Sequence, residues 1–370
     1  MSTLTDRCLT ADQLVVAAAI RTSGLFDGDW YRNTYPDVQT LDMDPVEHFV
    51  SIGARLGRNP SKKFDTKLYL ATHPELPGHN VNPLLHFIES RRDRAPATTL
   101  SSTILPLSVS TIILSYNHEF YIERAIESAI SQHGIERHQI IVSDDGSSDT
   151  TREIIDGYAA RFPELIINIS SPSNSGISNN FRRCFSASSG TYIAVLEGDD
   201  YWVSDDKLLW QSRFLQSNDD CSMVFSKIAL LDQSSGEFKY LDRQGAQLSS
   251  KLNGRDFLAD PNMNLIVNFS SCMFRASLVK NLPDVLYAGR LSEIALAFYL
   301  ENFGKIGFIQ EVMGVYRQHS AGVWTGSDRR AQLESALNIR RAAKQVAREE
   351  YKEKIQRVID EQLLPALSNL

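Results

Sequence analysis

The stretch VSTIILSY, residues 109–116, decides the fold, because its β-branched and apolar residues form the continuous run typical of a strand buried on both faces. Helical spacing follows over residues 119–133, and strand and helix keep alternating up to residue 200. Further strands are expected at 138–143, 165–171 and 190–197, and further helices at 150–162 and 179–188. This alternation predicts an α/β domain whose mixed, mainly parallel sheet is flanked by helices, with right-handed crossovers.

Polar clusters follow three of these strands: SYN at 115–117, SDDGSSD at 143–149 and EGDD at 197–200. Ligands bind beyond the carboxyl ends of parallel strands, so these clusters should converge. At least four carboxylates would then approach one cleft, which is costly unless a cation neutralises them. Mg²⁺ or Mn²⁺ suits such oxygen ligands and commonly shares them with substrate phosphates. A capped turn without a ligand is the alternative for EGDD taken alone.

Three residues at the strand ends are suited to binding a nucleoside. Tyr116 offers a flat ring to a base, Asp145 can accept a hydrogen bond from a base N–H, and Asn174 can contact base or ribose. The chain contains neither a Walker loop nor a Gly-rich dinucleotide fingerprint. A metal ion is therefore expected to hold the phosphates.

The stretches at residues 109–132, 140–151, 173–181 and 190–202 together resemble the nucleotide-binding half of family 2 glycosyltransferases, which have the GT-A fold. The resemblance covers about residues 108–326 and implies a role for each matching residue. Tyr116 would stack on the base, Asp145 would bind it, and Asn174 would support the nucleoside. Ser115 and Glu119 would line the same pocket. Many relatives carry an Arg where this chain has Asn179, so the base itself stays open.

The resemblance also implies the metal ligands and the catalytic base. Asp199 would contact ribose or metal, and Asp200 would hold the Mn²⁺ or Mg²⁺ that bridges the diphosphate. His319 would complete the metal shell or touch the diphosphate. Glu293, counted back from GKIGFI at residues 304–309, falls on the acidic position expected for the general base. An ordinary glutamate in a first helical turn and a structural histidine are the alternatives for these last two residues.

The implied function is that of an inverting, metal-dependent glycosyltransferase. It would move a sugar from a nucleoside-diphosphate donor, with a UDP-sugar favoured, to a hydroxyl of a glycan or lipid-linked acceptor in bacterial surface polysaccharide or glycoconjugate synthesis. The segment 320–329 is expected to close over the donor. The alternative function is a catalytically degenerate scaffold that works through its N-terminal repeats.

Composition narrows the class of protein. The 370 residues are 42% hydrophobic and 22% charged, enough for one large domain and a smaller one. A net charge of −7 argues against nucleic acid as a partner. We expect a cytoplasmic protein, because no apolar run reaches the ~20 residues of a membrane span and no signal peptide is evident. Scattered cysteines argue against zinc and disulfides.

A repeat with an offset of 38 residues precedes this domain. Matching pairs include Tyr31 with Tyr69 and His48 with His86, and we interpret the histidines as packing residues rather than ligands. The predicted division is a helical repeat domain at 1–95, a linker at 96–107, the GT-A domain at 108–327 and a helical extension at 328–370. The repeats are expected to contact a protein partner or a second copy, and the extension is expected to pack against the GT-A domain or a partner subunit. Peripheral contact of the extension with the inner face of the membrane is the alternative.

Overall fold

The structure is a computed structural model that describes residues 9–41, 43–73, 76, 81–93, 106–239, 248–320, 322 and 328–370. It divides into two compact units, Met1–Ile104 and Leu105–Leu370, each of which is described by itself. Most of the predicted linker and most of the predicted closing loop at 320–329 lie outside the described residues. Among the described helices, none is both long and apolar enough for a membrane crossing. The four-part division of the chain stays a prediction.

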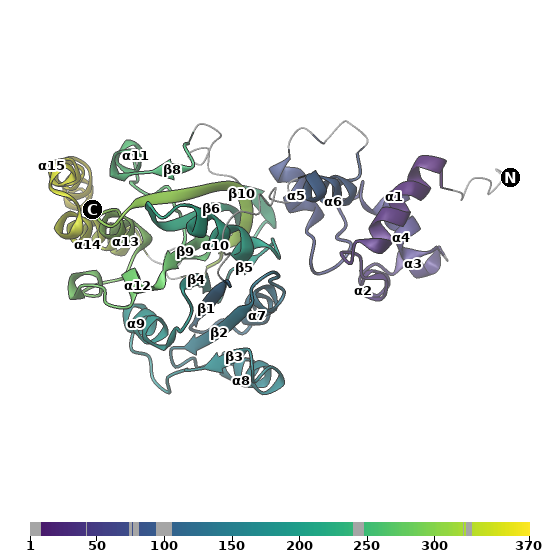
Figure 1. Cartoon of the computed structure of the whole chain (residues 1–370), viewed down its shortest axis with the longest axis horizontal. Coiled ribbons are helices and arrows are strands. Elements are labelled where there is room, and N and C mark those ends of the chain that lie inside the picture. Colours follow the sequence, from purple (N-terminus) through teal and green to yellow (C-terminus); the bar gives the residue numbers. More distant parts are fainter. Residues whose placement is uncertain are drawn as a thin grey trace. The chain divides into compact units, whose positions relative to one another are not determined.

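The first unit is helical, as the repeats predict (Figure 1). Its elements are α1 (Ala11–Thr22), α2 (Gly28–Thr34), α3 (Asp37–Thr40), α4 (Pro45–His48), the π-helical turn Phe49–Gly53, α5 (Thr66–Thr72) and α6 (Pro83–Asp93). Asp27 and Asp65 cap α2 and α5 at equivalent positions, each accepting a backbone N–H three residues on. The short helix α3 was not expected from the sequence. One apolar core runs through both repeats and α1, so the two repeats stack.

The paired histidines are packing residues within the repeats. The Tyr31 hydroxyl lies 3.0 Å from His48 Nδ1, and the equivalent Tyr69 hydroxyl lies 2.7 Å from His86 Nδ1. Each pair links the first helix of its repeat to the second. The repeat therefore preserves a tyrosine–histidine hydrogen bond as well as its apolar residues.

The second unit is built on one mixed sheet with the strand order β3-β2-β1-β4-β9-β6-β10-β5. The strands are β1 (Ser108–Ser115), β2 (Arg137–Asp144), β3 (Ile166–Asn168), β4 (Tyr192–Glu197), β5 (Tyr201–Trp202), β6 (Cys221–Asp232), β7 (Glu237–Lys239), β8 (Lys251–Leu252), β9 (Cys272–Arg275) and β10 (Lys305–Gln318). The longest ladders, β1 with β2, β1 with β4 and β6 with β10, are parallel. β9 lies antiparallel between β4 and β6. The mixed, mainly parallel sheet predicted from the sequence is confirmed.

Helices cover both faces of this sheet (Figure 1). They are α7 (Ile122–Ile130), α8 (Thr151–Arg161), α9 (Ile177–Ala187), α10 (Lys207–Ser217), α11 (Gly254–Ala259), α12 (Ala276–Val279) and α13 (Glu293–Leu300), with 3₁₀ turns at Phe269–Ser271 and Asp284–Leu286. Residues of β1 alternate between two cores: Val109 and Ile113 pack with α7, and Ile112 and Leu114 pack with α9. This alternation explains why the strand is apolar on both faces.

The C-terminal helices complete one of these cores. They are α14 (Arg329–Val346), α15 (Glu349–Val358), the π-helical turn Ile359–Leu363 and α16 (Leu364–Ser368). Leu337, Ala343 and Tyr351 are buried in the same cluster as α13. Packing of this segment against the second unit, one of the expected arrangements, is therefore observed.

Candidate active site

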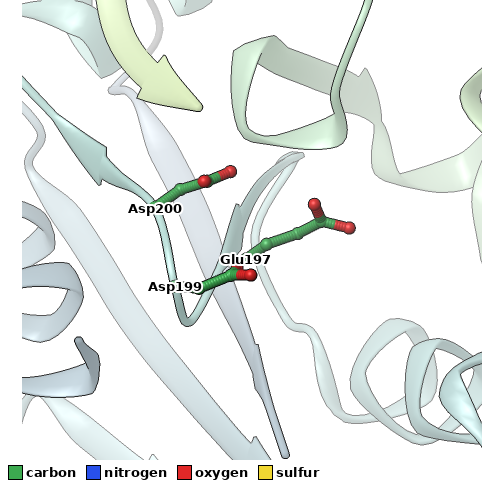
Figure 2. A group of neighbouring side chains, drawn as sticks. All are labelled: Glu197, Asp199 and Asp200. Carbon is green, nitrogen blue, oxygen red and sulfur yellow. The ribbon is translucent and has the colours of Figure 1, made fainter. Parts of the chain in front are cut away.

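The strand β4 ends in an acidic turn, defined as Glu197 to Asp200, which carries three clustered carboxylates (Figure 2). One ligand oxygen from each of Glu197, Asp199 and Asp200 lies within 4.8 Å of the others. Gly198 leaves no room for a side chain, because a Cβ there would lie 2.8 Å from His118 Nδ1 and 2.9 Å from the Leu114 carbonyl oxygen. The turn is therefore packed against the end of β1, as expected for this edge of the sheet. The cluster among the described residues holds three carboxylates rather than the four or more expected, and Asp145 pairs with Arg183 instead.

Asp200 is fully buried, and both of its carboxylate oxygens accept hydrogen bonds from the protein. Ser270 Oγ donates to Oδ2 at 2.6 Å, and the Arg317 backbone N–H donates to Oδ1 at 2.9 Å. Burial, followed by the charges of Asp199 and Glu197, raises the pKa of Asp200 well above its usual value. Asp200 thus ties the acidic turn to the segment after residue 268 and to β10.

Asp199 lies between two imidazoles. His319 Nε2 is 3.1 Å from Asp199 Oδ2, and His118 Nε2 is 3.7 Å from the same oxygen. Burial alone would raise the pKa of Asp199, but His118 and then His319 outweigh burial and lower it. Arg317 does not reach this carboxylate: its Nε donates to the Asp199 backbone carbonyl at 2.8 Å. The side chain of Asp199 is therefore held in its charged form beside two imidazole nitrogens.

Glu197 is partly buried and accepts a hydrogen bond from Asn268 Nδ2 at 2.7 Å. Burial and the charge of Asp199 raise the pKa of Glu197 to about 7, although Arg290 acts in the opposite direction. Two of the three carboxylates thus hold a proton more tightly than usual. The neighbouring carboxylates repel one another, and a bound divalent cation would relieve that repulsion. A set of carboxylate oxygens and imidazole nitrogens suits Mn²⁺.

Asp145, which follows β2, is held by an ion pair and hydrogen bonds from nearby residues. Arg183 Nη2 lies 3.0 Å from Oδ1, Ser175 Oγ donates to Oδ1 at 2.9 Å, and the Gly176 N–H donates to Oδ2 at 2.8 Å. Burial would raise the pKa of Asp145, but hydrogen bonds from Arg183 and Ser175 lower it. Asn174 lies in the same loop and accepts the Gly176 N–H at 2.9 Å. The structure brings Asp145 and Asn174 together, as expected.

Tyr116 and Glu119 lie in the loop after β1. The side chain of Tyr116 is exposed at this edge, which leaves its ring available for stacking. Glu119 Oε2 instead accepts hydrogen bonds from the Thr150 N–H at 3.2 Å and from its hydroxyl at 2.8 Å. That carboxylate locks the loop to the start of α8. Ser115 is buried, and its hydroxyl has no hydrogen-bond partner among the described residues.

Glu293, the predicted general base, begins α13 directly after the N-cap residue Ser292. Its Oε1 accepts a hydrogen bond from Asn264 Nδ2 at 2.8 Å. Its charge also raises the pKa of Glu197, after the larger effects of burial and Asp199. Glu293 is therefore close enough to the acidic turn to act electrostatically on it, although 96 residues separate the two in the sequence.

Sequence reasoning missed three residues of this site. His118 approaches Asp199, Arg183 pairs with Asp145, and Ser270 accepts the Glu197 N–H at 2.9 Å while donating to Asp200. No sequence pattern indicated Arg183, which lies on α9 with its Nη2 3.0 Å from Asn180 Oδ1. A signal existed for His118, because it lies between Tyr116 and Glu119, which are both expected at the site.

Comparison with known proteins identifies the family and the fold of this domain. The family model described as "Glycosyl transferase family 2" matches residues 110–282. The chain is 30% identical over 222 residues to "Uncharacterized protein Rv1520" of Mycobacterium tuberculosis, covering 58% of this chain and 60% of that protein. The chain thus spans about three fifths of the length of the first curated relatives it matches.

Two solved structures share the fold. The S. aureus TarS structure, residues 1–349 with UDP-GlcNAc, has a TM-score of 0.53 and 16% identity and covers 71% of this chain and 73% of that chain. The mannosyltransferase PcManGT from Pyrobaculum calidifontis with GDP-Man and Mn²⁺ has a TM-score of 0.52 and 14% identity, covering 82% and 83%. The GT-A fold is therefore confirmed, and residues 110–282 of this chain are a glycosyl transferase family 2 domain.

Proposed function

We propose that this protein is a metal-dependent glycosyltransferase that moves a sugar, with inversion, from a nucleoside diphosphate to an acceptor hydroxyl. The observation that carries the proposal is the acidic turn, whose crowded carboxylates lie at the carboxyl edge of the sheet within electrostatic reach of Glu293. The acceptor class stays as expected from the sequence: a glycan or lipid-linked hydroxyl in a bacterial surface polysaccharide or glycoconjugate.

The metal-ligand assignment changes from the one expected. Asp200 has both oxygens hydrogen-bonded and is fully buried, so we assign it the role of holding the acidic turn. Asp199 and His319 are the better ligands, because Asp199 Oδ2 and His319 Nε2 lie 3.1 Å apart and Asp199, unlike Asp200, is only partly buried. A bound Mn²⁺ or Mg²⁺ would supply positive charge to the diphosphate as it leaves. The carboxylate of Glu197, at the start of the acidic turn, would then balance part of the positive charge of the metal ion.

The donor nucleoside would lie over β1 and β2. Tyr116 offers the exposed ring for the base, and Asn174 offers its amide beside Asp145. Arg183 and Ser175 already use part of the hydrogen-bonding capacity of Asp145. The Gly176 N–H also donates to Oδ2, so both oxygens of this buried carboxylate are occupied. Asp145 therefore mainly shapes the pocket, and a base N–H would share one of these oxygens. UDP and GDP both carry such an N–H, and UDP remains the favoured nucleotide.

Glu293 would take the proton from the acceptor hydroxyl. The acceptor oxygen attacks the anomeric carbon, the bond from that carbon to the β-phosphate oxygen breaks, and the nucleoside diphosphate leaves with the bonding electrons. Attack opposite the leaving group inverts the anomeric centre. The helix N-terminus at α13 favours the ionised carboxylate that a base requires.

A panel of UDP- and GDP-sugars, assayed for release of the nucleoside diphosphate with and without Mn²⁺, tests the proposal. We expect Mn²⁺-dependent release from at least one donor and its loss in Glu293→Gln, which should still bind that donor. Neither release nor donor binding with any member of the panel would overturn the proposal and favour the scaffold function.

A further inference from the structure

Two asparagines in one loop each donate a hydrogen bond to a carboxylate of the proposed site. Asn264 Nδ2 lies 2.8 Å from Glu293 Oε1, and Asn268 Nδ2 lies 2.7 Å from Glu197 Oε2. The two asparagines are four residues apart in the segment from Asp260 to Asn268, which we call the asparagine loop. Through them, one loop reaches both the predicted base and the acidic turn.

The orientation of the Asn264 amide is fixed by its second partner. Its Oδ1 accepts the Val267 backbone N–H at 2.9 Å, so the NH₂ group must face Glu293. The backbone N–H of Asn264 donates to Asp260 Oδ1 at 3.2 Å. A side chain with one acceptor end and one donor end is thus required at this position. Aspartate has the same shape but would present an oxygen to Glu293.

The backbone of the asparagine loop is strained. Met263 and Val267 have positive φ values of 53° and 77°, in the region that favours glycine. For a β-branched residue such as Val267 this conformation is a genuine outlier. Met263 and Ile266 are fully buried in the core, which holds the loop in place. Strain of this kind concentrates at functional sites.

The C-terminal extension anchors the same loop. Arg340 in α14 is buried, and its Nη2 donates to the Asn262 backbone carbonyl at 2.5 Å. Burial lowers the pKa of the Arg340 guanidinium, and the charges of Glu293 and Asp260 partly oppose this effect. The extension, which lies beyond the matched family segment, therefore supports the loop that reaches the predicted base.

We infer that Asn264 and Asn268 of the asparagine loop position two carboxylates for the transfer reaction, and that Asn264 is the residue that aims Glu293 at the acceptor hydroxyl. This inference rests on the proposed function. Asn264 is a positioning residue rather than a catalytic one, because it acts through Glu293. Asn268 performs the corresponding role for Glu197, so the loop sets the placement of both carboxylates together.

The test compares Asn264→Asp with Asn262→Asp in the full chain. Both variants add one negative charge to the same loop, but the side chain of Asn262 is exposed and makes no described contact. The substrate is the member of the nucleotide-sugar panel that wild type turns over fastest. For Asn264→Asp we expect kcat to fall about tenfold to a hundredfold with KM for the donor within twofold, since a misaimed base slows chemistry without weakening donor binding.

The pH profile separates positioning from a general structural defect. The added carboxylate beside Glu293 favours protonation of that base, so the loss in Asn264→Asp should be largest at low pH and shrink as pH rises. Asn262→Asp should follow the wild-type profile. Asn264→Ala, paired with Asn262→Ala, repeats the comparison without added charge if the aspartate variant unfolds at a lower temperature.

Each outcome decides a different claim. If wild type turns over a nucleotide sugar and the Asn264 variants have the same kcat as their Asn262 controls, the inference is overturned but the proposed function is not. A raised donor KM with unchanged kcat also overturns it, because the loop would then serve donor binding. Absence of turnover by wild type with every nucleotide sugar overturns the proposed function and this inference with it.

Discussion

Asp145 and the acidic turn both place carboxylates at the carboxyl edge of the sheet, after β2 and β4. The electrostatic surroundings of the two groups differ. Asp145 is paired with Arg183 and hydrogen-bonded to Ser175, which lowers its pKa. In the acidic turn, no described Lys or Arg side chain pairs with a carboxylate, and the pKa values of Glu197 and Asp200 are raised. The first carboxylate is neutralised by the protein itself. The second group is arranged to be neutralised by something that binds.

Removing the charge of Asp199 should have the largest effect on the rate of nucleoside diphosphate release. We expect Asp199→Asn to lose on the order of 10³-fold or more in Mn²⁺-dependent release of nucleoside diphosphate, because the leaving diphosphate loses its metal support. The rate of release from the best donor of the panel measures this effect. Asp219→Asn, at a fully solvated aspartate, is the matched control and should retain the wild-type rate. Equal rates in both variants would place the metal elsewhere.

Asp145→Asn should act mainly on stability, in contrast to Asp199→Asn. Its partner Arg183 is partly buried and would be left without its counter-charge, so we expect the free energy of unfolding to fall by about 2 kcal/mol. Urea unfolding monitors the change. Asp156→Asn breaks an exposed pair with Arg152 and should cost no more than about 0.5 kcal/mol. Similar losses in both variants would show that Asp145 is not the neutralised anion described above.

The surplus charge of the acidic turn should make stability fall as pH rises. The folded pKa of Glu197, about 7, exceeds the ordinary value of 4.5, so the folded chain holds a proton that the unfolded chain releases between these values. The stabilisation is full below pH 4.5 and is lost as pH rises through 7.

Glu197→Gln should remove this contribution. Relative to the variant, wild type should therefore lose about 2 kcal/mol in the free energy of unfolding between pH 4.5 and 7.5, a figure that allows for partial exposure of Glu197. Saturating Mn²⁺ should flatten the difference. A wild-type curve parallel to that of Glu197→Gln at every pH would contradict the raised pKa.

The smallest effect is expected in the repeat unit, where each polar pair joins a tyrosine hydroxyl to a histidine nitrogen. Tyr31→Phe removes the hydroxyl that contacts His48, and Tyr69→Phe removes its repeat equivalent beside His86. Each should lower the free energy of unfolding by about 1 kcal/mol without altering nucleoside diphosphate release. Thermal unfolding of the full chain compares the two. A clear loss of activity in either variant would connect the repeats to catalysis.

The sequence predicts those features of this molecule that depend on local pattern. Apolar periodicity located β1, β2, β4 and α7 to α9, and the rule for parallel sheets brought residues 143–149 and 197–200 to one edge. The repeat pairs are confirmed because each repeat uses the same Tyr–His contact.

Contacts that depend on the pairing of distant strands could not be predicted from the local sequence pattern. The antiparallel insertion of β9 between β4 and β6 places Ser270 beside Asp200, and nothing local to either residue indicates that contact. The same applies to Asn264 and Glu293, which are 29 residues apart. Two adjacent aspartates look alike in a sequence, and only packing separates the buried Asp200 from Asp199 with its two imidazoles.

Direct titration of the full chain with Mn²⁺ in the presence of UDP or GDP, followed by electron paramagnetic resonance, tests the central claim. We predict one tightly held Mn²⁺ ion in wild type, and the same in Asp145→Asn if that variant is folded. In both Asp199→Asn and His319→Gln, the affinity for Mn²⁺ should fall at least tenfold. Equal Mn²⁺ affinity in wild type, Asp199→Asn and His319→Gln would contradict it.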